Sequence, residues 1–263
     1  GRSYTRQLVD RLVEQDLSSA DMNWHTRYAQ QANWTRDLRH YIFEKVDLRH
    51  SSHVLEVGCG TGAVLSELSE KTKAYGLDIN RDSLIECLAH ATNAFLTQGN
   101  AIDLPFAASS FTITYSHFLL LWVDDPLRAL LEMKRVTQKY GYVIAFAEPD
   151  YLHRVDQPEG LIPLGKWQTE ALIRHGADPG LGGRLAELFF EAGIHIIETG
   201  VIQSQGNEFS SEEWKLEWDV LESDLKGWVP DQDIQEMKRL DQQARRQKTR
   251  LLHVPTHFAW GRV

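Results

Sequence analysis

A glycine-rich stretch constrains the fold of this chain more than any other feature. It reads VLEVGCGTGAVL, from Val54 to Leu65. Glycine in mid-chain costs backbone entropy, so Gly58, Gly60 and Gly62 together need a structural reason. A strand that ends in such a loop and opens a helix presents unpaired backbone N–H groups at the carboxyl edge of a sheet, where nucleotide-like ligands dock. The stretch therefore predicts an α/β fold that binds a ligand at this turn.

The segments after His53 alternate between strand and helix patterns. Strand patterns occupy residues 53–58, 73–79, 95–101, 111–117 and 142–149, and helix patterns occupy 61–72, 81–92 and 126–137. Alternation at this pitch implies right-handed crossovers and a parallel sheet covered by helices on both faces. We expect five parallel strands from this region.

The alternation breaks beyond Pro149. Helix patterns follow at 161–176, 182–193, 211–226 and 231–250, and strand patterns at 195–205 and 254–263; upstream, residues 6–17 and 34–46 also have helical spacing. We predict a helical lid over residues 1–50 and an α/β domain over 51–263, with helical insertions at about 151–180 and 206–253.

Composition argues against several classes of protein. The formal net charge of −9 works against non-specific nucleic-acid binding. The longest apolar run, 118–123, is far shorter than the roughly 20 residues of a membrane span, and the N-terminal segment lacks the apolar stretch of a signal peptide. The two cysteines are not in a paired spacing, which fits a reducing cytosol, and no His, Cys, Asp or Glu cluster has metal-ligand spacing. We expect a cytoplasmic protein without a metal.

The glycine loop fits two kinds of cofactor site. GCGTGA can be aligned with the dinucleotide pattern G-x-G-x-x-G/A, and Asp78 follows Gly58 by about 20 residues, as that pattern requires. Glu56 favours a different ligand, because a carboxylate beside an anionic pyrophosphate would repel it, whereas a cationic cofactor has the opposite preference. The pattern E-x-G-x-G-x-G resembles motif I of the class I S-adenosylmethionine-dependent methyltransferases.

Further motifs of that family follow in order. GLDIN, from Gly76 to Asn80, resembles motif II, whose acidic residue binds both ribose hydroxyls. GNAIDLPF at 99–106 resembles the segment that flanks the adenine, and residues 124–150 resemble the stretch before the fifth strand. The resemblance implies a Rossmann-like, doubly wound, mostly parallel seven-stranded sheet. Its last strand would insert antiparallel between the fifth and the sixth.

The resemblance also implies the cofactor, S-adenosylmethionine, with S-adenosylhomocysteine as its product. It assigns cofactor binding to Glu56, Gly58, Cys59, Gly60, Gly62, Asp78, Ile79, Asn100, Ala101, Ser116 and His117, with Arg27 and Tyr28 covering the methionine end. Asn100 stands where the family has an acidic residue; it can still hydrogen-bond the adenine but carries no charge. Cys59 can alternatively serve only as a small side chain that fills the loop.

Two histidines are candidate general bases. His117 follows the fourth strand and His153 follows the fifth, both at the carboxyl edge of the predicted sheet. His117 can equally be a packing residue whose backbone carbonyl holds the cofactor. Trp122, Tyr151 and Trp167 are candidates for an apolar acceptor pocket or for the core.

The resulting prediction is an enzyme that methylates a small molecule, with an aromatic or lipid-like acceptor expected. Two alternatives remain open. One is a methyltransferase that acts on tRNA or protein, and the other is a non-catalytic module that binds the cofactor. The sequence predicts no membrane partner and leaves the oligomeric state open.

Overall fold

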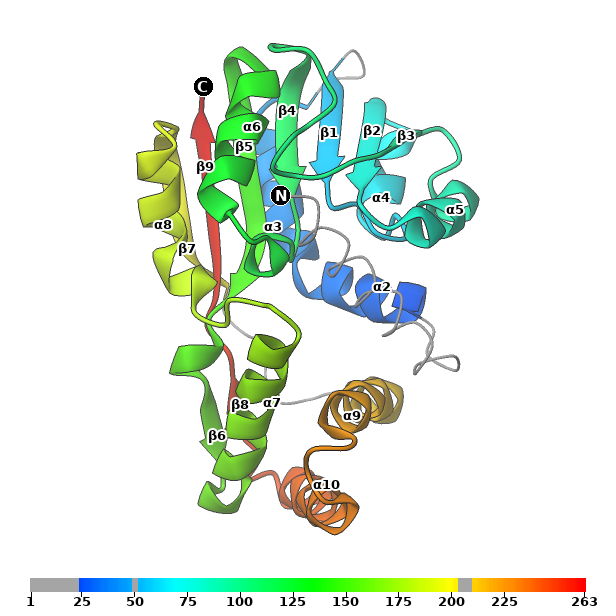
Figure 1. Cartoon of the computed structure of the whole chain (residues 1–263), viewed down its shortest axis with the longest axis vertical. Helices are drawn as coiled ribbons and strands as arrows, with labels where there is room; N and C mark the ends of the chain where they lie inside the picture. The colour runs from blue at the N-terminus through cyan, green and yellow to red at the C-terminus, as the bar shows by residue number, and fades with distance from the viewer. Residues whose placement is uncertain (1–23, 49–51, 203–209) are drawn as a thin grey trace.

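A seven-stranded sheet forms the centre of the molecule (Figure 1). The computed structural model describes residues 24–48, 52–202 and 210–263. The strand order is β3-β2-β1-β4-β5-β9-β7. The strands are β1 (His53–Val57), β2 (Lys73–Asp78), β3 (Phe95–Gln98), β4 (Phe111–Ser116), β5 (Thr137–Pro149), β7 (His195–Ile202) and β9 (Thr256–Arg262).

The pairing confirms the predicted topology. The first five strands pair in parallel, and β9 is antiparallel to both β5 and β7. The last strand thus inserts between the fifth and the sixth core strands, as the family resemblance implied. Because parallel strands point their carboxyl ends to one edge, the segments after β1, β2, β4 and β5 meet there.

Helices cover both faces of the sheet, and each face has its own apolar core. Helices α3 (Arg36–Lys45), α4 (Leu65–Ser69) and α5 (Arg81–His90) contribute to one core, and α6 (Pro126–Val136) and α8 (Leu181–Glu191) contribute to the other. Since both faces are covered, β1 reads as a nearly continuous apolar run, with Val54, Leu55 and Val57 fully buried.

Several predicted boundaries differ from the structure, and two of these differences have a local cause. Helix α4 is shorter than the predicted 61–72, because Gly62 has a φ of +84° and the chain keeps turning through Val64 before the helix begins. Strand β5 begins at Thr137 rather than at residue 142, since Thr137 already pairs with Phe111 before a register shift. The predicted helix at 6–17 lies outside the described residues.

The two insertions form one connected unit. It contains α7 (Ile162–Arg174), α9 (Ser211–Leu225) and α10 (Asp231–Arg246), and a short antiparallel sheet of β6 (Val155–Gln157) and β8 (Leu251–His253) that the sequence did not predict. Leu161, Trp218 and Leu225 belong to a third apolar core inside it. Buried Arg250 joins its parts, donating to Asp156 at 2.7 Å and to Asp241 at 2.6 Å.

Helix α2 (Trp24–Trp34) lies beyond the carboxyl ends of β1 and β2, between the sheet and the inserted unit (Figure 1). It belongs to the predicted N-terminal lid, whose residues 1–23 lie outside the described ranges. Among the described residues no helix is long and apolar enough to cross a membrane.

Candidate cofactor and active site

The glycine loop after β1 needs glycine for two physical reasons. Gly58, Gly60 and Gly62 have φ values of +76°, +49° and +84°, in the left-handed region that L-residues rarely adopt. Space is also limiting: a Cβ at Gly58 would lie 2.6 Å from the Leu119 side chain, and one at Gly62 would lie 2.6 Å from Cys87 Sγ. The loop is therefore a tight turn packed directly onto its neighbours.

Asp78 ends β2 beside this loop. Its Oδ2 accepts a hydrogen bond from the Gly60 N–H at 2.8 Å, and its Oδ1 accepts from the Asn80 N–H at 2.9 Å. Each carboxylate oxygen has a further lone pair that can accept from a hydroxyl. Burial raises the pKa of Asp78, although the backbone donors oppose that shift. The structure thus brings Asp78 and the loop into direct contact, as the motif spacing predicted.

Arg27 and Tyr28 are neighbours on α2 but make different contacts. A Cβ at Gly60 would lie 3.3 Å from Tyr28 Cε2, so the tyrosine ring covers the loop backbone. Arg27 instead binds Glu217 of α9 in a bidentate ion pair and donates to Gln30 Oε1 at 2.8 Å. Of the two predicted residues, Tyr28 lies against the glycine loop and Arg27 connects α2 to the inserted unit.

Glu56 lies beneath the loop. It is 2% exposed, and its Oε2 accepts a hydrogen bond from the Tyr115 hydroxyl at 2.9 Å. Burial raises the pKa of Glu56 well above its ordinary value, while Tyr115 and the nearby Arg39 favour the charged form. The carboxyl group of Glu56 therefore has its hydrogen-bond partner inside the core, in Tyr115.

Two buried polar groups at the site have no hydrogen-bond partner within the described residues. They are the hydroxyl of Ser116, at the end of β4, and the Nε2 amide group of Gln30, on α2. Leaving such a group unpaired costs roughly 1–3 kcal/mol, so native proteins rarely do so without a reason. Ser116 pairs with Val57 immediately before the glycine loop. The unpaired hydroxyl of Ser116 fits a polar ligand at this edge of the sheet.

The remaining predicted cofactor residues line the neighbouring turns. Asn100 Oδ1 accepts from the Ile102 N–H at 3.2 Å, and the Ile79 carbonyl accepts from the Gln98 side chain at 3.0 Å. Ala101 is buried in the core.

Cys59 of the loop lies against a second cysteine. Its hydrogen bond with Cys87, together with burial, raises the pKa of the Cys59 thiol well above its ordinary value. A protonated, buried thiol is a poor nucleophile, which favours the alternative that Cys59 fills space in the loop.

His117 lies under the junction of α2 and α3. Its Nε2 is 2.8 Å from the Thr35 hydroxyl oxygen, and its ring packs edge-on against Phe118. Burial, and then the positive charge of Arg39, lower the pKa of His117 to about 3. The imidazole is therefore neutral near pH 7 and a weak base.

His153 has a different environment. It lies in the short turn Tyr151–His153 after β5, and its side chain is exposed. Its Nδ1 is 2.7 Å from Oδ2 of buried Asp150. A carboxylate in this position orients the imidazole ring.

Comparisons with known proteins agree with this geometry. Residues 55–145 match the family model described as a methyltransferase domain. A demethylmenaquinone methyltransferase of Shouchella clausii is 26% identical over 66% of this chain and 81% of its own length. A malonyl-[acyl-carrier protein] O-methyltransferase of Erwinia billingiae is 30% identical over 48% of this chain, which spans about half (53%) of that relative.

The fold comparison points the same way. A crystal structure from Bacillus halodurans, described as a methyltransferase, superposes with a TM-score of 0.59 at 17% identity, covering 84% of this chain and 96% of the other. Residues 55–145 are a methyltransferase domain, and the chain has the fold of the class I S-adenosylmethionine-dependent methyltransferases. The residues that this methyltransferase would use to hold the cofactor are the glycine loop, Asp78, Tyr28 and the unpaired Ser116.

Two features of the methyltransferase site were not predicted from the sequence. Arg39 is fully buried, donates to the Ala32 carbonyl at 2.5 Å and forms an ion pair with Glu67 at 2.5 Å. In the sequence, Arg39 stands three residues before Ile42 and four before Phe43. This spacing places it on the same buried face of α3.

Glu148 is the second unpredicted feature. It is a fully buried carboxylate in β5 that accepts from the backbone N–H groups of Leu119, Leu120 and Leu121 at 2.9–3.2 Å. Burial raises the pKa of Glu148 to about 7. The carboxyl group holds the turn after β4 in place, directly after His117. The visible signal is one acidic residue inside the apolar run YVIAFAEP.

Proposed function

We propose that this methyltransferase transfers the methyl group of S-adenosylmethionine to a small-molecule acceptor held between α2 and the inserted unit. The ion pair between Arg27 and Glu217 is the observation that carries the proposal. It joins α2, whose Tyr28 covers the cofactor loop, to α9 of the insertion. A site covered in this way can enclose a small acceptor. It is less suited to a folded macromolecule.

The side chains gathered at this junction are mainly polar. Asp224 of α9 interacts electrostatically with Arg27 and Glu217, and burial raises its pKa to about 6. Burial also raises the pKa of Tyr151, whose ring belongs to the turn after β5 and which interacts with the same charges. These groups favour an acceptor that carries a polar substituent, in addition to the apolar body expected from the sequence.

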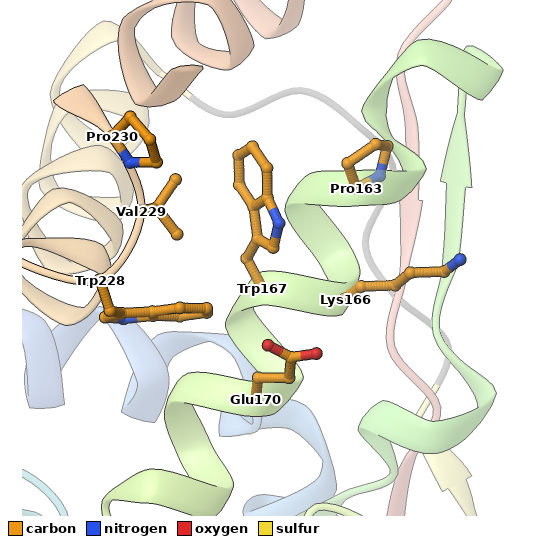
Figure 2. A pocket seen from close by; sticks show the side chains of 7 residues that line it. All are labelled: Pro163, Lys166, Trp167, Glu170, Trp228, Val229 and Pro230. Atoms are coloured by element: carbon orange, nitrogen blue, oxygen red, sulfur yellow. The ribbon is translucent and has the colours of Figure 1, made fainter. Parts of the chain in front are cut away.

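An apolar surface is available within the same inserted unit. Trp167 of α7 and Trp228 of the α9–α10 turn line an open cavity of about 400 Å³, together with Pro163, Lys166, Glu170, Val229 and Pro230 (Figure 2). The indole N–H of Trp228 donates to the Asp224 carbonyl at 2.8 Å, so the cavity lies next to the polar junction. An aromatic acceptor with a polar reacting group fits both surfaces.

The chemistry follows from the cofactor that the family uses. When bound, the cofactor would supply a methyl group on a cationic sulfur, and transfer would break the S–C bond, form a bond from carbon to the acceptor atom and release the proton of an O–H or N–H acceptor. Positioning and exclusion of water can supply much of the rate for such a displacement. His153, oriented by Asp150, is the better placed of the two histidines to take a proton, because His117 is a weak base.

A labelling experiment tests the proposal. The protein is incubated with methyl-labelled S-adenosylmethionine and a cell extract separated into small-molecule, RNA and protein fractions. Label in the small-molecule fraction supports the proposal, and its loss in Asp78→Ala shows that the predicted site is responsible. Label confined to RNA or protein would favour the macromolecular alternative. Calorimetric binding of the cofactor without any transfer would favour the non-catalytic one.

Glu217→Gln tests the lid contact. The variant removes the charge that pairs with Arg27 but keeps the size of the side chain. We expect a higher KM for the acceptor and a nearly unchanged dissociation constant for S-adenosylhomocysteine, because Tyr28 and Asp78 are untouched. Lys215→Gln, a change of an exposed residue on the same helix, is the matched control. Equal kinetics of the two variants would show that the Arg27–Glu217 ion pair has no role in acceptor binding.

A further inference from the structure

Three possible metal ligands meet at the rim of the glycine loop. His25 comes from α2, and Glu86 and His90 come from α5. One ligand atom from each lies within 4.8 Å of the other two. Glu86 and His90 are four residues apart on one helix, so their side chains share a face. His25 lies far upstream, and the sequence alone therefore did not indicate this cluster.

The chemistry of the three side chains suits a divalent transition metal. Two imidazoles and one carboxylate are a common donor set for Zn²⁺ and for Co²⁺ or Ni²⁺. Nδ1 of His25 is 2.8 Å from the Thr61 hydroxyl oxygen, and a partner on one ring nitrogen fixes the orientation in which the other can bind a metal.

The rings of His25 and His90 are stacked, with centroids 3.4 Å apart and planes at 5°. Ligands of a tetrahedral zinc ion lie about 3.3 Å apart, given bonds of about 2 Å. Simultaneous coordination therefore needs a rotation of His90 out of the stack and an approach of Glu86. Both side chains are exposed, so neither change disturbs the core.

We propose that a divalent transition-metal ion binds His25, Glu86 and His90 and holds α2 against α5 beside the cofactor loop. Thr61, which contacts His25, belongs to that loop, and Tyr28 on the next turn of α2 covers Gly60. A metal at this position stabilises the covered arrangement of the loop. The metal site goes beyond the proposed function and stands whether or not the acceptor is a small molecule.

Metal titration of the full chain tests the site directly. After treatment with a chelator, the protein is titrated with Zn²⁺ alone by calorimetry and with Co²⁺ alone by visible absorption. We expect one equivalent to bind, with cobalt bands typical of nitrogen and oxygen ligands. His90→Ala and Glu86→Gln should each weaken that binding by about tenfold or more. His40→Ala, which removes an exposed histidine of α3, should leave it unchanged.

Several outcomes would overturn the proposal. These are the absence of saturable binding, or binding that His90→Ala, Glu86→Gln and His40→Ala affect equally, since the metal would then occupy other histidines. A circular dichroism melt of the metal-free variants shows whether they remain folded. The coupling to the loop has its own readout: Zn²⁺ should tighten S-adenosylhomocysteine binding to the unsubstituted chain but not to His90→Ala, because coupling between sites is reciprocal. Equal cofactor affinity with and without zinc would refute the coupling.

Discussion

Replacement of His117 by glutamine should change the acid stability of this protein in a predictable way. The imidazole is held against the Thr35 hydroxyl and near the buried Arg39, and its pKa is lowered from 6.5 to about 3, mainly by burial. In the unfolded chain the same imidazole takes up a proton near pH 6.5. His117→Gln keeps an amide near Thr35 and removes the titration.

The sign and the size follow from linkage. Because the folded pKa is depressed, the contribution of His117 to the free energy of unfolding is complete above pH 6.5 and is lost as the pH falls toward 3. Each pH unit between these limits costs about 1.4 kcal/mol, so the full loss is about 5 kcal/mol, of which about 3 kcal/mol falls between pH 6.5 and 4.5. His117→Gln has no imidazole at this position and therefore does not lose this stability as the pH falls.

Urea denaturation at intervals between pH 4.5 and 8 measures the effect. The difference in free energy of unfolding between the unsubstituted chain and His117→Gln should be constant above pH 6.5. Below that pH it should shift in favour of the variant by about 1.4 kcal/mol per unit. Other titrating groups cancel in this difference. A difference that does not vary with pH, or an imidazole NMR titration of His117 near pH 6.5, would refute the reasoning.

Three further predictions concern the site. Asp78→Ala should weaken S-adenosylhomocysteine binding by about 2–3 kcal/mol in calorimetry, because it removes charge-assisted hydrogen bonds to the ribose; an unchanged dissociation constant would exclude Asp78 as the ribose ligand. Gly62→Ala should lower the free energy of unfolding by about 1–3 kcal/mol more than Gly176→Ala. Both glycines have a positive φ, but only at Gly62 would the added Cβ lie 2.6 Å from Cys87 Sγ. Equal losses of stability in urea titrations would contradict this. His153→Ala should lower kcat with little change in cofactor affinity; full turnover would show that His153 is not a catalytic residue.

The sheet could be predicted from the sequence because its signals are local. Each core strand, such as HVLEV in β1, is a short apolar run followed by a turn and a helix pattern, and this order fixes a parallel arrangement. The antiparallel β9 came from family resemblance, since its own pattern is compatible with either direction. The β6–β8 pair was missed because two three-residue strands, separated by most of the inserted unit, carry no pattern of their own.

The glycine loop and Asp78 could also be predicted. Glycines at this spacing indicate a strained turn, and the distance from Gly58 to Asp78 along the sequence matches the motif. The environments of single side chains could not. Glu56 is buried and bonded to Tyr115, and burial together with Arg39 lowers the pKa of His117. The charge of Arg39 on α3 acts on both residues from a distant part of the sequence. Burial and charge at a site are tertiary properties, and motifs do not encode them.

The contacts of α2 explain how a covered site can still exchange its ligands. The buried residues of this helix are Arg27, Gln30 and Ala32, whereas α3 buries Ile42 and Phe43 in the core as well as Arg39. Helix α2 is thus held mainly by polar contacts, and water can replace these when the helix moves away. Helix α3 is held by apolar contacts, and water does not replace those. Regions with few buried apolar contacts open at lower free energy than the global unfolding of the protein. We therefore expect α2 to move away from the loop while α3 remains on the sheet.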